Sequence, residues 1–173
     1  MEEAIALIDK LVEEHKLIRQ RIGNIESVAN DAEALGGLDK AKDAFMPGKL
    51  EQSQGLKRLQ ELVKIAKEGL DAHFNREETA LLSIVEKYGS KESASALRSL
   101  LLEHADLRNR FAHAERHVAE LVSGGLSRNL WEASAHDMRA HISHTRQLIE
   151  AHAGIEQELF HRLRSELAKQ QKK

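Results

Sequence analysis

The chain of 173 residues contains no cysteine, a single proline and few aromatic residues, which make up 3% of it. Without cysteine, the protein forms no disulfide, holds no iron–sulfur cluster through thiolates and uses no thiol nucleophile. Metals that prefer thiolate ligands are disfavoured for the same reason. The scarcity of aromatic residues and the lack of alternating β-branched runs argue against β-strands. Together these absences favour an all-α protein.

Charge and hydropathy exclude further classes of protein. The 26 basic and 28 acidic residues give a net charge of −2, so no overall basic field would attract nucleic acid or an anionic membrane. No apolar run approaches the ~20 residues of a membrane-spanning helix, and the acidic start Met1-Glu2-Glu3 does not resemble a signal peptide. We therefore expect one cytoplasmic domain over residues 1–173, without nucleic acid or membrane as a partner, whose residues 164–173 form a frayed basic tail.

Four segments repeat apolar residues every three or four positions, which is the period of an amphipathic α-helix. These segments cover about residues 5–25, 59–88, 97–122 and 138–167. Gly89 followed by Ser90 indicates the end of one helix and the N-cap of the next, and Gly124-Gly125 followed by Ser127 indicates another such boundary. The sequence therefore predicts an antiparallel up-down four-helix bundle.

The connection between the first two segments, about residues 34–54, is longer than the ~2–8 residues usual between bundle helices. It contains Pro47, which cannot interrupt a helix there, and residues 38–46 could form a short helix over one end of the bundle. Two interpretations remain open: a tolerated surface insertion, because loop length costs little, or a lid.

Histidine and glutamate residues recur inside the apolar stripes of all four segments. Two pairs stand four residues apart, so that both members project from one helix face, and two histidines stand alone. The six residues are His15, His73, Glu77, His104, His152 and Glu156. The midpoints between members on successive helical segments all fall at, or just past, a predicted helix connection. An antiparallel bundle would therefore bring all six side chains to one level of its core.

Four imidazoles and two carboxylates at one level could hold two transition-metal ions. If both carboxylates bridge and the imidazoles divide equally, each ion receives about four protein donors, and a solvent-derived bridge adds a fifth. About one octahedral position would then stay open for a small molecule. We therefore predict two iron ions per chain with an oxo or hydroxo bridge. Zinc and manganese are alternatives, although the set does not resemble a closed tetrahedral zinc site.

A metal-free structural bundle is the competing interpretation, because a single histidine in an apolar stripe is more often a hydrogen-bonded core residue. Burying two carboxylates without partners costs several kcal/mol each, against a total stability of only ~5–15 kcal/mol. Salt bridges with protonated histidines would offset part of that cost. The balance favours a metal site.

The series of site residues also resembles a known family. The order His15, His73-Phe-Asn-Arg-Glu77-Glu78, His104 and His152-Ala-Gly-Ile-Glu156 is similar to that of the hemerythrin-like HHE cation-binding domain, over essentially the whole chain. This resemblance implies a four-helix bundle that holds a non-haem, oxo- or hydroxo-bridged di-iron centre. It implies that the six residues named above are the iron ligands and that both glutamates bridge the two ions.

Two positions depart from the oxygen-carrying members of that family. Those members have a second histidine one turn after the helix-three ligand, where this chain has Arg108. They have an aspartate five residues after the helix-four histidine, where this chain has Gln157. The pattern is nearer the branch that includes iron-sensing domains and bacterial iron-centre repair proteins of the nitrosative-stress response. Those repair proteins carry a cysteine-bearing segment, and this sequence has no cysteine.

Two classes of function therefore remain. The first is a di-iron protein that binds or senses dioxygen, nitric oxide, iron or the redox state. The second is an oxidoreductase or iron-centre repair protein that acts in oxidative or nitrosative stress. No nucleotide motif or redox-partner motif is present, so binding is favoured and enzymatic activity stays open.

The other histidines mostly point away from the predicted site. At 100° per residue, four of them lie ~140–180° from the ligand of their helix and are predicted to be solvated. They are His113, His117, His136 and His161.

Several further polar residues allow two interpretations. His141 returns to the ligand face about three turns from His152, at the level of Glu26 and Glu115. These three residues form either a second polar cluster or separate salt bridges on the helix flanks. Arg108 either pairs with a site carboxylate or skirts the site. Gly69 either opens space for a diatomic molecule or allows close helix contact.

Overall fold

The computed structural model describes residues 2–31 and 50–171, with side chains for residues 2–31 and 54–169. The predicted short helix over residues 38–46 lies outside the described residues. The elements are α1 (Glu2–Asn30), α2 (Leu50–Arg76), the π-helical turn η1 (Glu77–Leu81), α3 (Leu82–Tyr88), α4 (Lys91–Leu101), α5 (His104–Ser123) and α6 (Arg128–Gln171).

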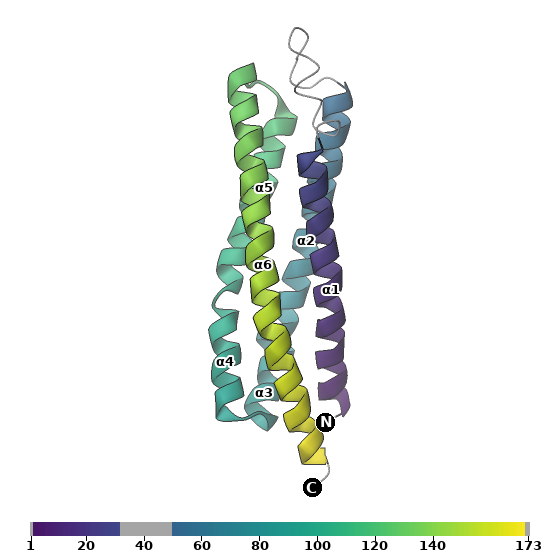
Figure 1. Cartoon of the computed structure of the whole chain (residues 1–173), viewed down its shortest axis with the longest axis vertical. Coiled ribbons are helices and arrows are strands. Elements are labelled where there is room, and N and C mark those ends of the chain that lie inside the picture. Colours follow the sequence, from purple (N-terminus) through teal and green to yellow (C-terminus); the bar gives the residue numbers. More distant parts are fainter. Residues whose placement is uncertain (1, 32–49, 172–173) are drawn as a thin grey trace.

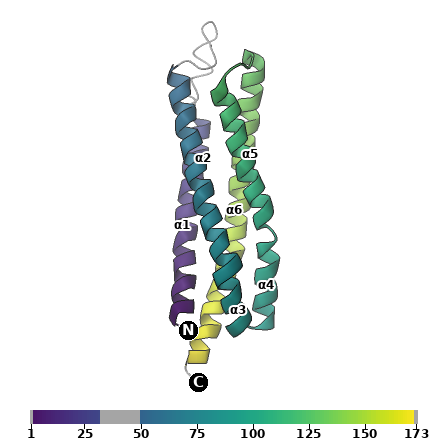
Figure 2. The ribbon, with the colours of Figure 1, turned by 180° about the vertical axis from the view of Figure 1, so that it is seen from behind.

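These elements form four antiparallel columns (Figure 1). The first column is α1, the second is α2–η1–α3, the third is α4–α5, and the fourth is α6. Helices α1 and α5 each pack against both α2 and α6, so they lie diagonally across the bundle, and Figure 2 shows α2 beside α5 from behind. The all-α up-down bundle is confirmed, with no strand in the described part of the chain. None of the described helices is long and apolar enough to span a membrane.

Two hydrophobic cores fill the bundle, and the polar candidate site lies between them. One core includes Ile22, Leu59 and Trp131, and the other includes Leu11 and Leu163. Burying each such large side chain contributes about 1.5–3 kcal/mol. The two cores therefore offset the cost of the buried polar layer that separates them.

The turns follow the glycine and serine positions in the sequence. Gly124 and Gly125 have φ angles of 74° and 85°, which side chains with a Cβ rarely adopt, and they link α5 to α6. Gly89 ends α3, because a Cβ there would lie 2.7 Å from the carbonyl oxygen of Val85. The Ser90 hydroxyl accepts a hydrogen bond from the Ser93 amide and so caps α4. Both predicted boundaries are confirmed.

The prediction of a frayed tail over residues 164–173 is wrong as far as Gln171. Helix α6 continues to that residue, and Leu167 is only 2% exposed. The Glu166 carboxylate accepts hydrogen bonds from the Ser90 amide and hydroxyl, at 3.1 Å each, and from the Ser93 hydroxyl at 3.0 Å. The end of α6 is held as a helix because Leu167 packs in the core that contains Leu11 and Leu163, and because Glu166 binds the α3–α4 turn. Helix α2 also begins earlier than predicted, since residues 50–54 are already helical.

Candidate metal centre

The six predicted residues converge in the middle of the bundle, and each is at most 3% exposed. His15 comes from α1, His73 from α2, Glu77 from η1, His104 from α5, and both His152 and Glu156 from α6. Two separate groups of donors have their atoms within 4.8 Å of one another: His15, His73, Glu77 and Glu156, and then His104, His152 and Glu156. The midpoints of the helical hairpins predicted that these side chains would meet at one level, and the structure brings them together there. The two groups share Glu156.

Each glutamate directs one oxygen to each group. Glu77 Oε1 lies 3.1 Å from His73 Nε2, whereas its Oε2 lies 3.4 Å from His104 Nε2. Glu156 Oε2 lies 3.2 Å from His15 Nε2, whereas its Oε1 lies 3.1 Å from His152 Nε2. We call the side with His15 and His73 the α1–α2 half, and the side with His104 and His152 the α5–α6 half. The carboxylates connect the two halves.

Most of the inward-facing oxygen and nitrogen atoms of the site lack a hydrogen-bond partner among the described residues. Both oxygens of Glu77 and of Glu156, and the Nε2 atoms of His15 and His73, have no hydrogen-bond partner within the described part of the chain. Their mutual contacts are close but lack hydrogen-bond geometry. Buried carboxylate oxygens without donors are costly, and a bound cation would satisfy all of them at once. This donor set therefore fits a metal centre.

A π-helical turn positions the two adjacent glutamates of the second column. Helix α2 ends at Arg76, and η1 begins at Glu77 with wider i→i+5 hydrogen bonding, a form that occurs frequently at functional sites. Glu77 faces the core, while the next residue, Glu78, reaches the His104 ring on α5. The apolar period over residues 59–88 predicted one regular helix here, without this turn.

The third column is interrupted at the site as well. Helix α4 ends at Leu101, two residues tighten into i→i−3 hydrogen bonds, and α5 begins at His104. At this break Leu102 is 80% exposed, and the Glu103 carboxylate accepts a hydrogen bond from His152 Nδ1 at 2.8 Å. The sequence predicted a continuous helix here. The break places a carboxylate beside the neighbouring helix.

Three of the four histidines donate their Nδ1 hydrogen to a carboxylate of a neighbouring column. Because a carboxylate only accepts, each ring must carry its proton on Nδ1, which leaves a lone pair on Nε2. The pairs are His73 with Glu14 at 2.9 Å, His104 with Glu78 at 2.8 Å, and His152 with Glu103 at 2.8 Å. Such partners fix the ring and raise its basicity toward a metal. Sequence reasoning gave no role to these glutamates. The signal available was that each stands directly beside a predicted site residue.

In the α5–α6 half, this proton arrangement leaves two lone pairs facing each other. His104 Nε2 and His152 Nε2 lie 3.2 Å apart, and both rings already use their Nδ1 hydrogen elsewhere. Without a cation the contact is favourable only if one ring takes a second proton. A metal ion would replace that proton.

Arginines anchor two of the bracing carboxylates. Arg76 binds both oxygens of Glu14, at 2.8 and 3.2 Å. Arg108 binds both oxygens of Glu78, at 2.7 and 3.1 Å, and contacts Asp71 at 3.3 Å. Arg108 thus pairs with a carboxylate next to the site rather than one inside it. These charge-assisted, two-pronged contacts hold the histidine partners in place.

His15 is the exception among the four histidines. Its Nδ1 has no hydrogen-bond partner among the described residues, and its ring stacks on Phe160 with centroids 5.4 Å apart. Gln157, which stands where oxygen carriers have an aspartate, points to α1 instead, and its Oε1 accepts from Arg19 Nη2 at 3.5 Å. His15 is therefore held by packing, without a bracing carboxylate.

The electrostatics of the metal-free centre show that it retains protons. Burial lowers the pKa of the His152 imidazole, but the contacts with Glu156 and then Glu103 outweigh burial and raise this pKa to about 9. Burial raises the pKa of Glu77, despite the opposing contact with His73. Burial also acts to raise the pKa of Glu156, but its close contacts with His104, His15 and His152 lower this pKa well below its usual range. The site therefore balances its charge with protons that a metal ion would displace.

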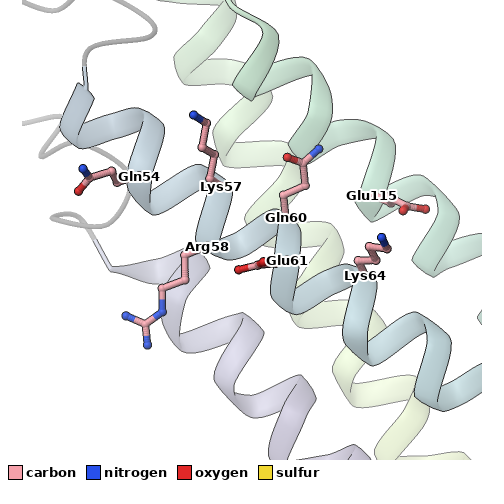
Figure 3. A pocket seen from close by; sticks show the side chains of 7 residues that line it. All are labelled: Gln54, Lys57, Arg58, Gln60, Glu61, Lys64 and Glu115. Carbon is pink, nitrogen blue, oxygen red and sulfur yellow. The ribbon is translucent and has the colours of Figure 1, made fainter.

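A small cavity of about 10 Å³ lies within the candidate site. It is lined by both histidines of the α1–α2 half, by His152 of the α5–α6 half, by Glu156, and by apolar side chains such as Leu70 and Ile149. That volume accommodates about one water-sized molecule. A much wider surface hollow of about 760 Å³ lies between α2 and α5, lined by polar residues such as Lys57, Gln60 and Glu115 (Figure 3). None of the six site residues lines this hollow, so the candidate chemistry belongs to the small cavity.

Glu26, Glu115 and His141 form no joint cluster. Glu26 pairs with Arg146 at 2.7 Å, and Glu115 pairs with Lys67 at 3.3 Å. His141 Nε2 instead donates to a backbone carbonyl of α5 at 2.9 Å. The interpretation of the two glutamates as salt bridges on the helix flanks is confirmed.

Gly69 serves close packing rather than a ligand channel. A Cβ at this position would lie 2.6 Å from Arg21 Nη1, so the guanidinium occupies the space that the missing side chain leaves. Among the histidines predicted to be solvated, His113, His136 and His161 are exposed, whereas His117 is half-buried.

Comparison with known proteins agrees with this geometry. A family model described as the hemerythrin HHE cation binding domain matches residues 6–153. No curated protein and no solved structure matches the chain. The match ends before Glu156, whose place in the site rests on its spacing from His152 and on the structure. Because the matched region spans most of the chain and contains all four buried histidines of the site, the chain belongs to the hemerythrin HHE cation-binding domain family.

Proposed function

We propose that this protein is a non-haem di-iron protein that binds or senses a small molecule, such as dioxygen or nitric oxide. The observation that carries this proposal is the division of each carboxylate between the two halves. Glu77 and Glu156 each direct one oxygen to the α1–α2 half and the other toward the α5–α6 half. Two ions bridged by two carboxylates would use all of these oxygens.

This set of imidazole and carboxylate donors suits iron better than it suits metals that prefer thiolate ligands. Imidazole and carboxylate together suit iron, and the chain offers no thiolate to attract softer metals. The four histidines and two glutamates would hold the ions, which would supply redox chemistry and a position for a small ligand. The bracing glutamates Glu14, Glu78 and Glu103 would keep three rings oriented toward the ions.

The small cavity supports binding of a diatomic molecule. Its volume of about 10 Å³ accommodates little more than one water molecule, and apolar side chains line it beside His15 and His73. A substrate-sized molecule would not fit there. This size favours a sensor or binding protein over an oxidoreductase or repair enzyme that acts on a larger substrate.

The test combines metal analysis with spectroscopy of the purified protein. We expect about two iron ions per chain and a ligand-to-metal charge-transfer absorption that changes when nitric oxide is added to the anaerobically reduced protein. We expect the reduced protein to oxidise in air and not to regain its reduced spectrum when oxygen is removed. Turnover with a reductant would favour the enzyme. A protein that takes up no iron and keeps its fold would contradict the proposal.

A further inference from the structure

Three histidines outside the metal centre lie together on the hairpin of α5 and α6. His113 and His117 stand four residues apart on α5, with their Nε2 atoms 3.2 Å apart. The ring of His141, from α6, lies 4.6 Å from that of His113 and 6.2 Å from that of His117, measured between centroids. The group is about 13 Å along α5 from His104, so it is separate from the buried centre.

The spacing of the two α5 nitrogens matches that of two ligands of one ion. Imidazole nitrogens bind Zn²⁺ at about 2.0–2.1 Å, so two of them in a tetrahedral site lie about 3.3 Å apart. His113 Nε2 and His117 Nε2 are 3.2 Å apart. Their i, i+4 positions place both rings on one helix face without any change of the backbone.

The hydrogen bond of His141 places its proton on Nε2 and leaves Nδ1 free to bind a metal ion. Its Nε2 lies 2.9 Å from the backbone carbonyl oxygen of Arg110 and must donate to it. The neutral ring therefore carries a lone pair on Nδ1, and a carbonyl on the other nitrogen is a common partner of a metal-bound histidine. The α5 pair has the spacing for one ion, and the His141 ring, with its centroid 4.6 Å from that of His113, lies beside the pair as the source of a third nitrogen.

The nearby charges permit a cation. Arg110 is paired with Asp106 at 2.8 Å. The charges of Arg116 and Glu120 act on His113 in opposite directions and so offset each other in part. Partial burial, and then the positive charges that His117 and His141 would carry, lower the pKa of His113. The lowered pKa favours the neutral His113 ring, which has a lone pair available for a metal ion.

We propose that His113, His117 and His141 form a second, surface metal site for a late first-row divalent cation, of which Zn²⁺ is the test ion. Imidazole ligands suit zinc, copper and nickel, and a surface position allows the ion to exchange with solution. The competing explanation of the 3.2 Å contact is a hydrogen bond between two neutral rings.

The test is a Zn²⁺ titration of the full-length protein in competition with a chromophoric chelator. The variant His113→Gln/His117→Gln is compared with wild type and with a matched control, His136→Gln/His161→Gln, which removes two other exposed histidines. We expect the first variant to bind one Zn²⁺ fewer per chain than wild type, while the control binds as wild type does. His141→Gln should weaken this site by about tenfold or more, since losing a ligand costs at least as much as losing a group that orients one.

The difference between variants does not depend on what occupies the buried centre, so failure of the di-iron proposal would leave this result interpretable. Metal content of the buried centre and thermal unfolding, measured on each variant, confirm that the fold is intact. Equal Zn²⁺ stoichiometry and affinity in wild type and in His113→Gln/His117→Gln would overturn the proposal.

Nuclear magnetic resonance of labelled histidine rings gives the second measurement. We expect the signals of His113, His117 and His141 to shift with one equivalent of Zn²⁺, while those of His136 and His161 stay unchanged. Shifts that leave out His141 would overturn the three-histidine site.

Discussion

The two halves of the metal centre have the same kinds of donor but different support. In the α5–α6 half, both histidines donate to a carboxylate, and the ring of His104 also stacks on Phe74 at a centroid distance of 3.7 Å. In the α1–α2 half, only His73 has a carboxylate, and His15 relies on Phe160. The small cavity is lined by both histidines of the α1–α2 half but by only one histidine, His152, of the α5–α6 half.

This difference suggests separate roles for the two halves, one in retaining the metal and the other in binding the small molecule. Bracing carboxylates fix the ring and increase its basicity, so the α5–α6 half should retain its ion more tightly. A ring held only by packing adjusts more easily when a small molecule binds beside it. We infer that the α5–α6 half anchors the centre and that the α1–α2 half meets the small molecule.

The largest effect should follow from removing the residue common to both halves. Glu156→Ala takes away a donor of each group, so we expect loss of most of the metal, measured as ions per chain by elemental analysis. Glu77→Ala should act in the same direction. The control is His161→Ala, an exposed residue of the same helix. If all three variants retained equal metal, the shared-carboxylate interpretation would be wrong.

Removing one histidine at a time should separate the halves. His15→Gln should leave the α5–α6 half able to keep an ion, whereas His104→Gln removes a braced ligand and should lose more metal. Elemental analysis after dialysis against a chelator measures both variants. Greater loss from His15→Gln than from His104→Gln would reverse the proposed order of the halves.

The bracing carboxylates should act on affinity without changing the number of sites. Glu78→Gln or Glu103→Gln should weaken metal binding by roughly 10–100-fold, because the histidine loses the negatively charged acceptor that orients its ring and raises its basicity. Chelator competition measures the change. Glu158→Gln, an exposed residue of α6, serves as the control and should bind as wild type does.

The pH dependence of the metal-free protein should report the proton that the α5–α6 half retains. The folded-state pKa of His152 is raised to about 9, so its contribution to stability is complete below its unfolded pKa and is lost as pH rises through about 9. We expect the free energy of unfolding to fall by about 1–2 kcal/mol between pH 7 and 9. Urea unfolding measures it.

Two comparisons test that assignment. The variant His152→Gln should lack this fall, because it has no group to lose the proton. Metal-loaded protein should lack it as well, since the ion takes the place of the proton. A fall of the same size in metal-free His152→Gln would assign the proton to another group.

The sequence was sufficient for the fold and for the six inward-facing donors. Apolar periods, Gly89-Ser90 and Gly124-Gly125 give helix lengths and turns, and antiparallel hairpins of known length bring matched positions together. The prediction of a frayed tail was wrong, because the helical period alone does not show that Glu166 contacts the α3–α4 turn.

Residues that act between columns could not be assigned in the same way. Glu14, Glu78 and Glu103 each stand beside a site residue in the sequence but serve a histidine on another helix. Which flank of a helix meets which neighbour depends on helix rotation, on the π-helical turn at Glu77 and on the break before His104. Sequence period does not report these local departures.

The sequence by itself therefore determined the bundle, its turns and the donors at one level, because these follow from local period and chain length. Only the tertiary structure decided the inequality of the two halves. That inequality depends on side-chain contacts across helices, where His152 finds Glu103 but His15 finds only Phe160. Contacts between distant residues form only when packing fixes the rotation of each helix, and that rotation is a property of the whole core.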